Sequence, residues 1–94
     1  MNIAPDEVLL VGSWIQREGA VVGDEVCARI RSLVAGSLVK LGHDSSGWDT
    51  LFRDPEDGRL WELLYPQSHL HGGGPPTLRA IDPTEAAAKY GIAQ

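Results

Sequence analysis

The stretch GWDTLFRDPEDGRLWELLYPQSHLHGGGPP, residues 47–76, decides the fold of this chain. Two apolar and aromatic runs, Trp48–Phe52 and Leu60–Tyr65, flank the turn sequence DPEDG at residues 54–58. Strand-like runs separated by a short Pro/Gly/Asp loop are typical of a β-hairpin. Both faces of each run carry apolar residues, which is typical of strands in the middle of a sheet that has a helix on one side and partial cover on the other. We therefore predict a central hairpin, whose second face is a partner-binding patch if nothing in the chain covers it.

The residues before this hairpin predict two strands. Val8–Arg17 is an apolar run interrupted at Gly12, so we expect one strand with a bulge or a close backbone approach at that glycine. Glu18-Gly19 predicts a turn, because glycine adopts the positive φ that hairpin turns require. Ala20–Val22 then returns as a second, short strand.

A long amphipathic helix is predicted between Asp24, a suitable N-cap, and Gly42, a suitable left-handed residue after the helix end. Gly36 lowers the helical propensity, and a close crossing over the sheet is one reason for a glycine there. Cys27 lies beside the apolar face and is interpreted as a buried, inert thiol. That face consists of apolar residues at helical spacing: Val26, Ile30, Leu33, Val34, Leu38 and Leu41.

The end of the chain predicts one more strand, Thr77–Ile81, and a short helix, Pro83–Tyr90, with Asp82 as its N-cap and Gly91 as its stop. The predicted order is strand, strand, helix, strand, strand, strand, helix. Strands joined by tight turns indicate a mostly antiparallel sheet. We therefore expect one α+β domain over residues 1–94, in two layers, with the long helix packed on one face of the sheet and a short C-terminal helix.

Charge and composition limit the class of protein and its partners. The chain has 94 residues, a net charge of −5 and a single cysteine, which excludes an internal disulfide. Residues 44–62 carry six acidic side chains against two arginines, so this segment holds most of the excess negative charge. That balance disfavours nucleic acid and anionic membranes and favours a basic partner. The first ten residues lack the pattern of a secretory signal, and we expect a cytoplasmic protein without a membrane span.

Catalytic and metal-binding interpretations of the sequence are weak. His69 and His71 form a His-x-His pair that a metal ion can use, with His43 or a carboxylate as a third ligand, but no further ligand motif accompanies them. The glycines at 72–74 are followed by two prolines, unlike a phosphate-binding loop. We therefore predict no catalytic residue, cofactor or metal, and keep a small His-dependent metal protein or a generic interaction subunit as the alternatives.

Aromatic and acidic residues of the hairpin are the predicted contact region for a partner. An aromatic side chain beside an acidic rim is a composition typical of binding hot spots. The equally simple interpretation is a solvated hairpin with acidic turn residues. The residues predicted as contacts are Asp49, Asp54, Glu56, Asp57, Glu62, Trp48 and Trp61.

The central stretch resembles the immunity protein 27 family, small bacterial proteins encoded beside polymorphic toxins such as Rhs-type effectors. The similarity lies in the DPEDGR, LWEL, YP and LHGGGPP segments and extends to VLLVGSWI, GDEVCARI and EAAAKYG, so it covers nearly the whole chain. The chain departs from the family pattern at Leu60, where an aromatic is common, and at His69, where an acid is common.

The resemblance implies a stoichiometric toxin inhibitor that is not an enzyme. Its expected partner is a cognate toxin domain encoded by the adjacent gene, basic in charge and bound as a 1:1 heterodimer, with neither nucleic acid nor membrane involved. Immunity acts in the producing cell, so the resemblance also implies a cytoplasmic location. Complementary charge would speed the association of such a pair.

Overall fold

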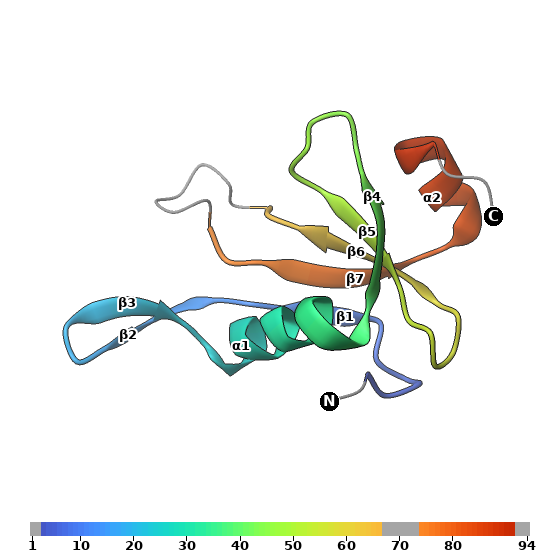
Figure 1. Ribbon diagram of the computed structural model, residues 1–94. Helices are drawn as coiled ribbons and strands as arrows, with labels where there is room; N and C mark the ends of the chain where they lie inside the picture. Colours follow the sequence, from blue (N-terminus) through green and yellow to red (C-terminus); the bar gives the residue numbers. More distant parts are fainter. Residues whose placement is uncertain (1–2, 67–73, 92–94) are drawn as a thin grey trace.

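The fold is an antiparallel sheet with a helix against each of its faces (Figure 1). The computed structural model describes residues 3–66 and 74–91. In chain order the elements are β1 (Leu9–Val11), β2 (Trp14–Arg17), β3 (Ala20–Gly23), α1 (Glu25–Ser32), the π-helical segment η1 (Leu33–Ser37), β4 (Val39–His43), β5 (Thr50–Arg53), β6 (Leu60–Leu64), β7 (Thr77–Ile81) and α2 (Pro83–Tyr90). The predicted α+β class with a mostly antiparallel sheet is confirmed.

The main sheet has five strands in the order β1-β7-β6-β5-β4, and every neighbouring pair is antiparallel. The predicted central hairpin is β5 and β6, in which Phe52 lies opposite Trp61 and Leu51 opposite Glu62. β6 also pairs with β7, which places it in the middle of the sheet. The apolar residues on both faces of β6 are explained by this central position.

The predicted strand Val8–Arg17 is wrong as one element, because the chain divides it between two sheets. β1 joins the main sheet, whereas β2 turns back on β3 to form a separate hairpin that projects from the body of the molecule (Figure 1). The division falls at Gly12, whose N–H donates to the Pro76 carbonyl oxygen at 2.8 Å. The close backbone approach expected at this glycine is therefore confirmed. The turn at Glu18-Gly19 is also confirmed, with φ values of 52° and 81°.

The predicted helix from Asp24 to Leu41 is too long. Asp24 caps it as expected, accepting from the Cys27 N–H at 2.9 Å, but α1 and η1 end at Ser37. The Leu38 N–H donates to the Leu33 carbonyl oxygen at 2.8 Å, which closes a wider π-type turn and ends the helix. Val39–His43 then extends as the edge strand β4 beside β5, with a bulge between Lys40 and Gly42. Gly42 thus lies in the strand opposite Leu51 and is not a helix end, and the residue left unpaired by the bulge is Leu41.

The helical spacing of Leu38 and Leu41 led to a wrong prediction, because a strand directs residues at this spacing to different faces than a helix does. Residues three apart share a face of a helix but lie on opposite faces of a strand. Leu38 accordingly joins the core under α1, and Leu41 packs at the core under α2. Pairing with β5 therefore outweighed the local helical pattern, which glycine and serine at 36 and 37 had already weakened.

Alternation along the strands separates two apolar cores, one on each face of the sheet. The core between the sheet and α1 contains Ile3, Leu10, Ile30, Leu33, Leu38, Phe52, Trp61 and Leu78. The smaller core between the sheet and α2 contains Leu51, Leu60, Ile81 and Ala86. The second face is thus partly covered by the chain itself, so α2 adds a partial third layer to the two that the sequence predicted.

Gly12→Ala is expected to destabilise the fold, because an added Cβ atom would lie 2.6 Å from the Cys27 sulfur and 2.7 Å from the Pro76 oxygen. Crowding of this kind in a packed interior costs about 1–3 kcal/mol, measurable by urea unfolding. Gly36→Ala is the control, because its Cβ would meet no described atom within 4 Å. It should leave stability unchanged or raise it by up to about 1 kcal/mol. Equal losses in the two variants would contradict this account.

Candidate functional site

The loop between β4 and β5, residues 44–49, holds an exposed tryptophan on a hydrogen-bonded frame. Asp44 Oδ1 accepts from Ser46 Oγ at 2.7 Å, from the Gly47 N–H at 3.1 Å and from the Asp49 N–H at 3.4 Å. Ser46 Oγ in turn accepts from the Trp48 N–H at 3.1 Å. These bonds, with the Ser46 hydroxyl first, lower the pKa of Asp44, which keeps it an ionised acceptor at neutral pH.

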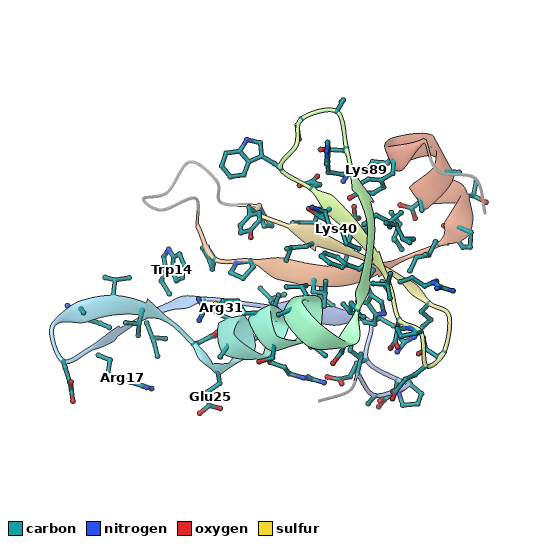
Figure 2. All side chains as sticks on the ribbon, viewed as in Figure 1. Trp14, Arg17, Glu25, Arg31, Lys40 and Lys89 are labelled. Atoms are coloured by element: carbon teal, nitrogen blue, oxygen red, sulfur yellow. The ribbon has the colours of Figure 1, made fainter. Side chains whose placement is uncertain are left out.

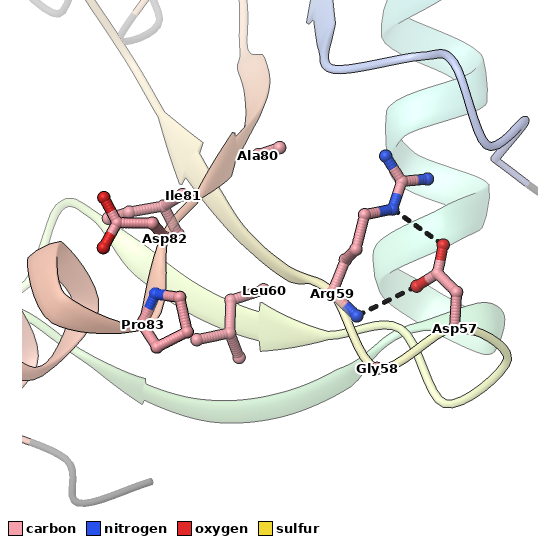
Figure 3. A pocket seen from close by; sticks show the side chains of 8 residues that line it. All are labelled: Asp57, Gly58, Arg59, Leu60, Ala80, Ile81, Asp82 and Pro83. Atoms are coloured by element: carbon pink, nitrogen blue, oxygen red, sulfur yellow. Dashed lines mark hydrogen bonds and ion pairs between the residues drawn. The ribbon is translucent and has the colours of Figure 1, made fainter.

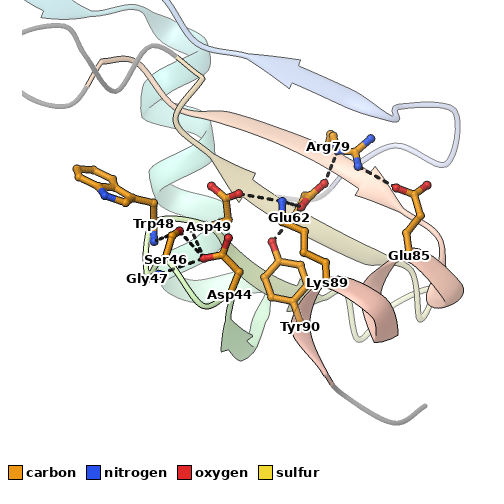
Figure 4. Close-up of polar contacts among 10 residues, drawn as sticks. All are labelled: Asp44, Ser46, Gly47, Trp48, Asp49, Glu62, Arg79, Glu85, Lys89 and Tyr90. Carbon is orange, nitrogen blue, oxygen red and sulfur yellow. Dashed lines mark hydrogen bonds and ion pairs between the residues drawn. The ribbon is translucent and has the colours of Figure 1, made fainter.

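Trp48 itself is 56% exposed, which leaves a large aromatic surface open to solvent. Its indole lies edge-on to Tyr65, with ring centroids 6.1 Å apart. The side chain points away from the charged groups beneath it (Figure 4). A loop that is ordered by internal hydrogen bonds and displays a tryptophan outward is suited to anchor an interface.

A buried carboxylate, Glu62 at the centre of β6, connects this loop to α2. Its oxygens accept from Lys89 Nζ at 2.9 Å, from Tyr90 Oη at 2.9 Å and from Arg79 Nε on β7. Lys89 Nζ also lies 2.8 Å from Asp49 Oδ2, so one ammonium group joins the tryptophan loop to the buried acid (Figure 4). The cluster thereby fixes α2 and the loop against the same face of the sheet.

The pKa values in this cluster show that Glu62 is held as an anion. Burial acts to raise the pKa of Glu62, but the donors Lys89, Arg79 and Tyr90 outweigh it and lower the pKa below its usual value. Burial disfavours the charged form of Lys89, and its two carboxylate partners outweigh that effect and raise its pKa. Burial and the nearby Glu62 raise the pKa of Tyr90, so its hydroxyl remains a donor.

The turn between β5 and β6, residues 54–59, is the second acidic feature of the surface. Asp57 accepts from the Arg59 backbone N–H at 2.9 Å and from Arg59 Nε at 2.7 Å. These contacts, the backbone N–H first, lower the pKa of Asp57. Arg59 also donates to the carbonyl oxygens of Glu7 at 2.6 Å and Ala4 at 3.1 Å, and its guanidinium lies 4.9 Å from the Trp61 ring centroid. Arg59 therefore ties the acidic turn to the N-terminal segment and to the core.

A wide depression of about 460 Å³ lies beside this turn (Figure 3). Leu60, Ile81 and Pro83 supply apolar lining, Asp57 and Arg59 lie at one end, and Asp82 lies at the other. Its acidic groups already have partners, since Asp57 is paired with Arg59 and Asp82 accepts from the first N–H groups of α2. Both carboxylates at the depression are thus already hydrogen-bonded within the fold.

The seven residues predicted as partner contacts divide by burial. Those that keep exposed surface are Trp48, Asp49, Glu56 and Asp57. Those that lie inside the fold are Asp54, Trp61 and Glu62. The exposed ones lie on the two loops described above, and the buried ones hold those loops in place.

The described residues give no structural support to the metal-binding and catalytic alternatives. Among residues 3–66 and 74–91, no three His, Cys, Asp or Glu side chains gather as a metal site. His43 is exposed at the end of β4, and His69 and His71 lie outside the described residues. Cys27 is buried, as predicted, with its sulfur 3.5 Å from the Ser13 carbonyl oxygen. In the described part of the chain, no helix is long and apolar enough to cross a membrane.

Sequence reasoning did not find Arg79, Lys89 and Tyr90, the three partners of Glu62. The sequence does indicate that Glu62 has such partners, because Glu62 lies within the apolar run of a central strand. A charged residue there is buried and requires donors from elsewhere in the chain. The sequence does not say which donors, because they follow Glu62 by 17 to 28 residues.

The exposed apolar residues Val21 and Val22 on the projecting hairpin were also not singled out from the sequence. Val21 is 68% exposed, and neighbouring side chains such as Trp14 and Arg17 extend from opposite faces of this hairpin (Figure 2). A two-stranded hairpin with little cover is marginally stable on its own. Val21 and Val22 follow each other in β3, so they expose apolar side chains on opposite faces of this hairpin, apart from Trp48.

The geometry is that of a small α+β scaffold that presents acidic and aromatic side chains on two ordered loops. A family model described as Immunity protein 27 matches residues 16–82, well over half of the chain. The chain therefore belongs to the immunity protein 27 family, which confirms the resemblance seen in the sequence. Membership indicates the immunity component of a toxin–immunity pair. Searches of curated proteins and of solved structures gave no significant match.

Glu62→Gln is expected to lower the free energy of unfolding by about 2–3 kcal/mol, because charge-assisted bonds to three donors are weakened in a buried site. Urea unfolding near neutral pH measures the change. Glu85→Gln is the matched control, since Glu85 is an exposed partner of Arg79 at 3.1 Å. A surface pair of this kind contributes about 1 kcal/mol or less. A control variant that loses as much as Glu62→Gln would contradict the role given to the buried acid.

The same variant tests the charge state of Glu62. The folded-state pKa is lowered from 4.5, so the carboxylate contributes stability above that pH and loses it as the pH falls through the lower folded value. The stability gap between the wild type and Glu62→Gln should therefore shrink in acid. A gap that stays constant into strongly acidic solution would show that Glu62 is not stabilised as an anion.

Proposed function

We propose that this protein binds the toxin domain encoded by its adjacent gene and neutralises it by forming a stoichiometric 1:1 complex, without any catalysis of its own. The observation that carries the proposal is the match of residues 16–82 to the immunity protein 27 family. A tight complex that covers the toxin's active site, or its access, is sufficient for immunity. The protein acts in the cytoplasm of the cell that makes the toxin.

The charge of the chain supports a basic toxin as the partner. The net charge is −5, and Glu56 has no ion pair among the described residues. Complementary charge speeds association and disfavours wrong partners more than it adds affinity. Fast capture is valuable for an inhibitor that must reach its toxin before the toxin reaches its target.

Trp48 is the proposed anchor of the interface. Hot-spot residues are enriched in tryptophan and are effective when the free protein already holds them in the bound arrangement. The Asp44 frame and the Asp49–Lys89 contact supply that order here. Asp49 and the acidic turn are the proposed rim, whereas Trp61 and Glu62 support the surface from inside.

Co-purification with the adjacent gene product tests the proposal directly. The expected result is a 1:1 complex by multi-angle light scattering, together with loss of the toxin's activity at one equivalent of this protein. Absence of a toxin gene next to this one, or full toxin activity in the presence of excess protein, would overturn the proposal.

Trp48→Ala is expected to weaken toxin binding by about thirtyfold or more, since truncation of a hot spot costs roughly 2 kcal/mol or more. Its effect on folding should be small because the side chain is 56% exposed. Val39→Ala, which truncates a 44% exposed apolar residue on the β4 edge, is the control and should bind as the wild type. Calorimetric titration with the toxin domain measures both affinities, and an unchanged affinity in Trp48→Ala would exclude it as the anchor.

A further inference from the structure

The hairpin of β2 and β3 stands apart from the body of the fold. It forms a two-stranded sheet of its own and projects beyond the five-stranded sheet (Figure 1). Every residue from 16 to 22, which includes the turn at Glu18-Gly19, is exposed. A two-stranded hairpin is marginally stable when it stands alone in water, so this one is suited to gain cover from a partner.

Contacts at the base of the hairpin fix its direction. The Asp24 N–H donates to the Ser13 carbonyl oxygen at 2.9 Å, which ties the end of β3 to the residue before β2. At Gly23 the backbone packs directly on α1, since an added Cβ atom would lie 2.8 Å from the Cys27 Cβ atom. The hairpin is therefore held at its base and exposed at its tip, so its direction is set before any partner binds.

The register of the hairpin places apolar side chains on both of its faces. Ile15 lies opposite Val22, so these two side chains share one face. Val21 lies opposite Gln16 on the other face, which also carries Trp14. Val21 is 68% exposed and Val22 is 37% exposed. A hairpin that lies flat on a partner needs only one apolar face, whereas this one fits between two walls of a partner.

The hairpin leaves the main sheet at the same end as the loop that carries Trp48. Because all neighbouring strands are antiparallel, β1 runs in the same direction as β4. The end of β1, after which the hairpin starts, and the end of β4, where the Trp48 loop starts, therefore lie at one end of the sheet (Figure 1). The acidic turn between β5 and β6 lies at the other end. A partner seated on Trp48 is thus on the side from which the hairpin projects.

The segment that contains the hairpin is apolar and neutral. Many of the exposed large apolar side chains in the described part of the chain lie within residues 8–22: Val8, Leu9, Val11, Val21 and Val22. The charged residues of this segment are Arg17 and Glu18, which cancel, although the whole chain has a net charge of −5. The hairpin is therefore suited to apolar contact, whereas the acidic loops are suited to attract a basic partner.

A second copy of the chain fits the hairpin poorly. The wide depressions on the described surface are lined by ionised side chains, which are Asp57 and Arg59 in one and Glu7 and Arg29 in another. Covering such groups with valine removes their water without replacing it. Two chains that each carry a net charge of −5 also repel one another. The toxin domain, already expected at this end of the sheet, is the occupant that the observations favour.

We propose that the hairpin of β2 and β3 inserts as a wedge into a cleft of the toxin domain, with Ile15 and Val22 against one wall and Trp14 and Val21 against the other. The inference rests on the proposed function and adds a second contact element to the Trp48 loop. The exposed charges near the tip, such as Arg17, require a cleft that is polar at its deep end. Mostly apolar walls with a few polar groups are typical of active-site clefts, so the wedge fits the toxin's active site or its entrance.

The test uses Val21→Thr and Val22→Thr, singly and combined, in the full chain with the purified toxin domain. Threonine has the shape of valine and favours strands, so the hairpin should keep its structure while one methyl group on each face becomes a hydroxyl. Val39→Thr is the matched control, because Val39 is 44% exposed and lies opposite Arg53 at the other end of the sheet. Urea unfolding verifies the fold, and surface plasmon resonance measures both rates.

The wedge predicts a change in dissociation more than in association. Each valine variant should raise the dissociation rate by about fivefold, and the double variant by about twentyfold or more, because apolar contact is lost in the complex. Association should change by less than about twofold, since no charge is altered. Val39→Thr should change neither rate by more than about twofold. In hydrogen exchange, the amides of residues 14–23 should exchange quickly in the free protein and slowly in the complex.

Failure of the wedge and failure of the proposed function give different results. If the wild type does not bind the toxin, the proposed function is wrong. If the wild type binds and the double variant dissociates at the wild-type rate, the wedge is wrong while the proposed function stands. Unchanged exchange of the amides of residues 14–23 in the complex has the same meaning. Self-association of the free chain that the double variant abolishes, measured by sedimentation velocity, would assign the hairpin to a second copy and would likewise overturn the wedge.

Discussion

The buried carboxylate of Glu62 is the constraint on which much of this small structure depends. It lies at the centre of the central strand β6 and is stable there only because Arg79, Lys89 and Tyr90 donate to it. Those donors come from β7 and from the end of α2, so one charge determines where the C-terminal helix lies on the sheet. Among the described residues, the core under that helix contains four buried apolar residues, which makes the polar cluster a large part of what holds α2 in place.

The same cluster reaches the surface through Lys89, which joins Glu62 to Asp49. The loop that displays Trp48 is thereby attached to a central strand of the sheet. A surface that binds a partner tightly benefits from such order, because less conformational entropy is lost on association. If the loop is the interface, as proposed, stability and recognition are linked, because Glu62 positions the loop that displays Trp48.

Local elements of the fold were predictable from the sequence wherever short-range chemistry decides them. The cap at Asp82, the stop at Gly91, the cap at Asp24 and the turn at Glu18-Gly19 all depend on residues within a few positions. The end of the long helix was not predictable, since Leu38 and Leu41 fit the helical pattern as well as the strand. Pairing of β4 with β5 decided it, and that pairing depends on the position of the whole central hairpin.

The sequence by itself determined that this chain carries an acidic, aromatic hairpin in an antiparallel sheet and the segments of an immunity protein 27 family member. Only the tertiary structure decided which of these acids are buried and which have an ion pair. Glu62 is neutralised by side chains distant in sequence, Asp57 is neutralised by Arg59, and Asp54 and Glu56 have no ion pair among the described residues. The physical reason is that the cost of a charge depends on its burial and on its donors, and both are set by contacts that folding alone brings together.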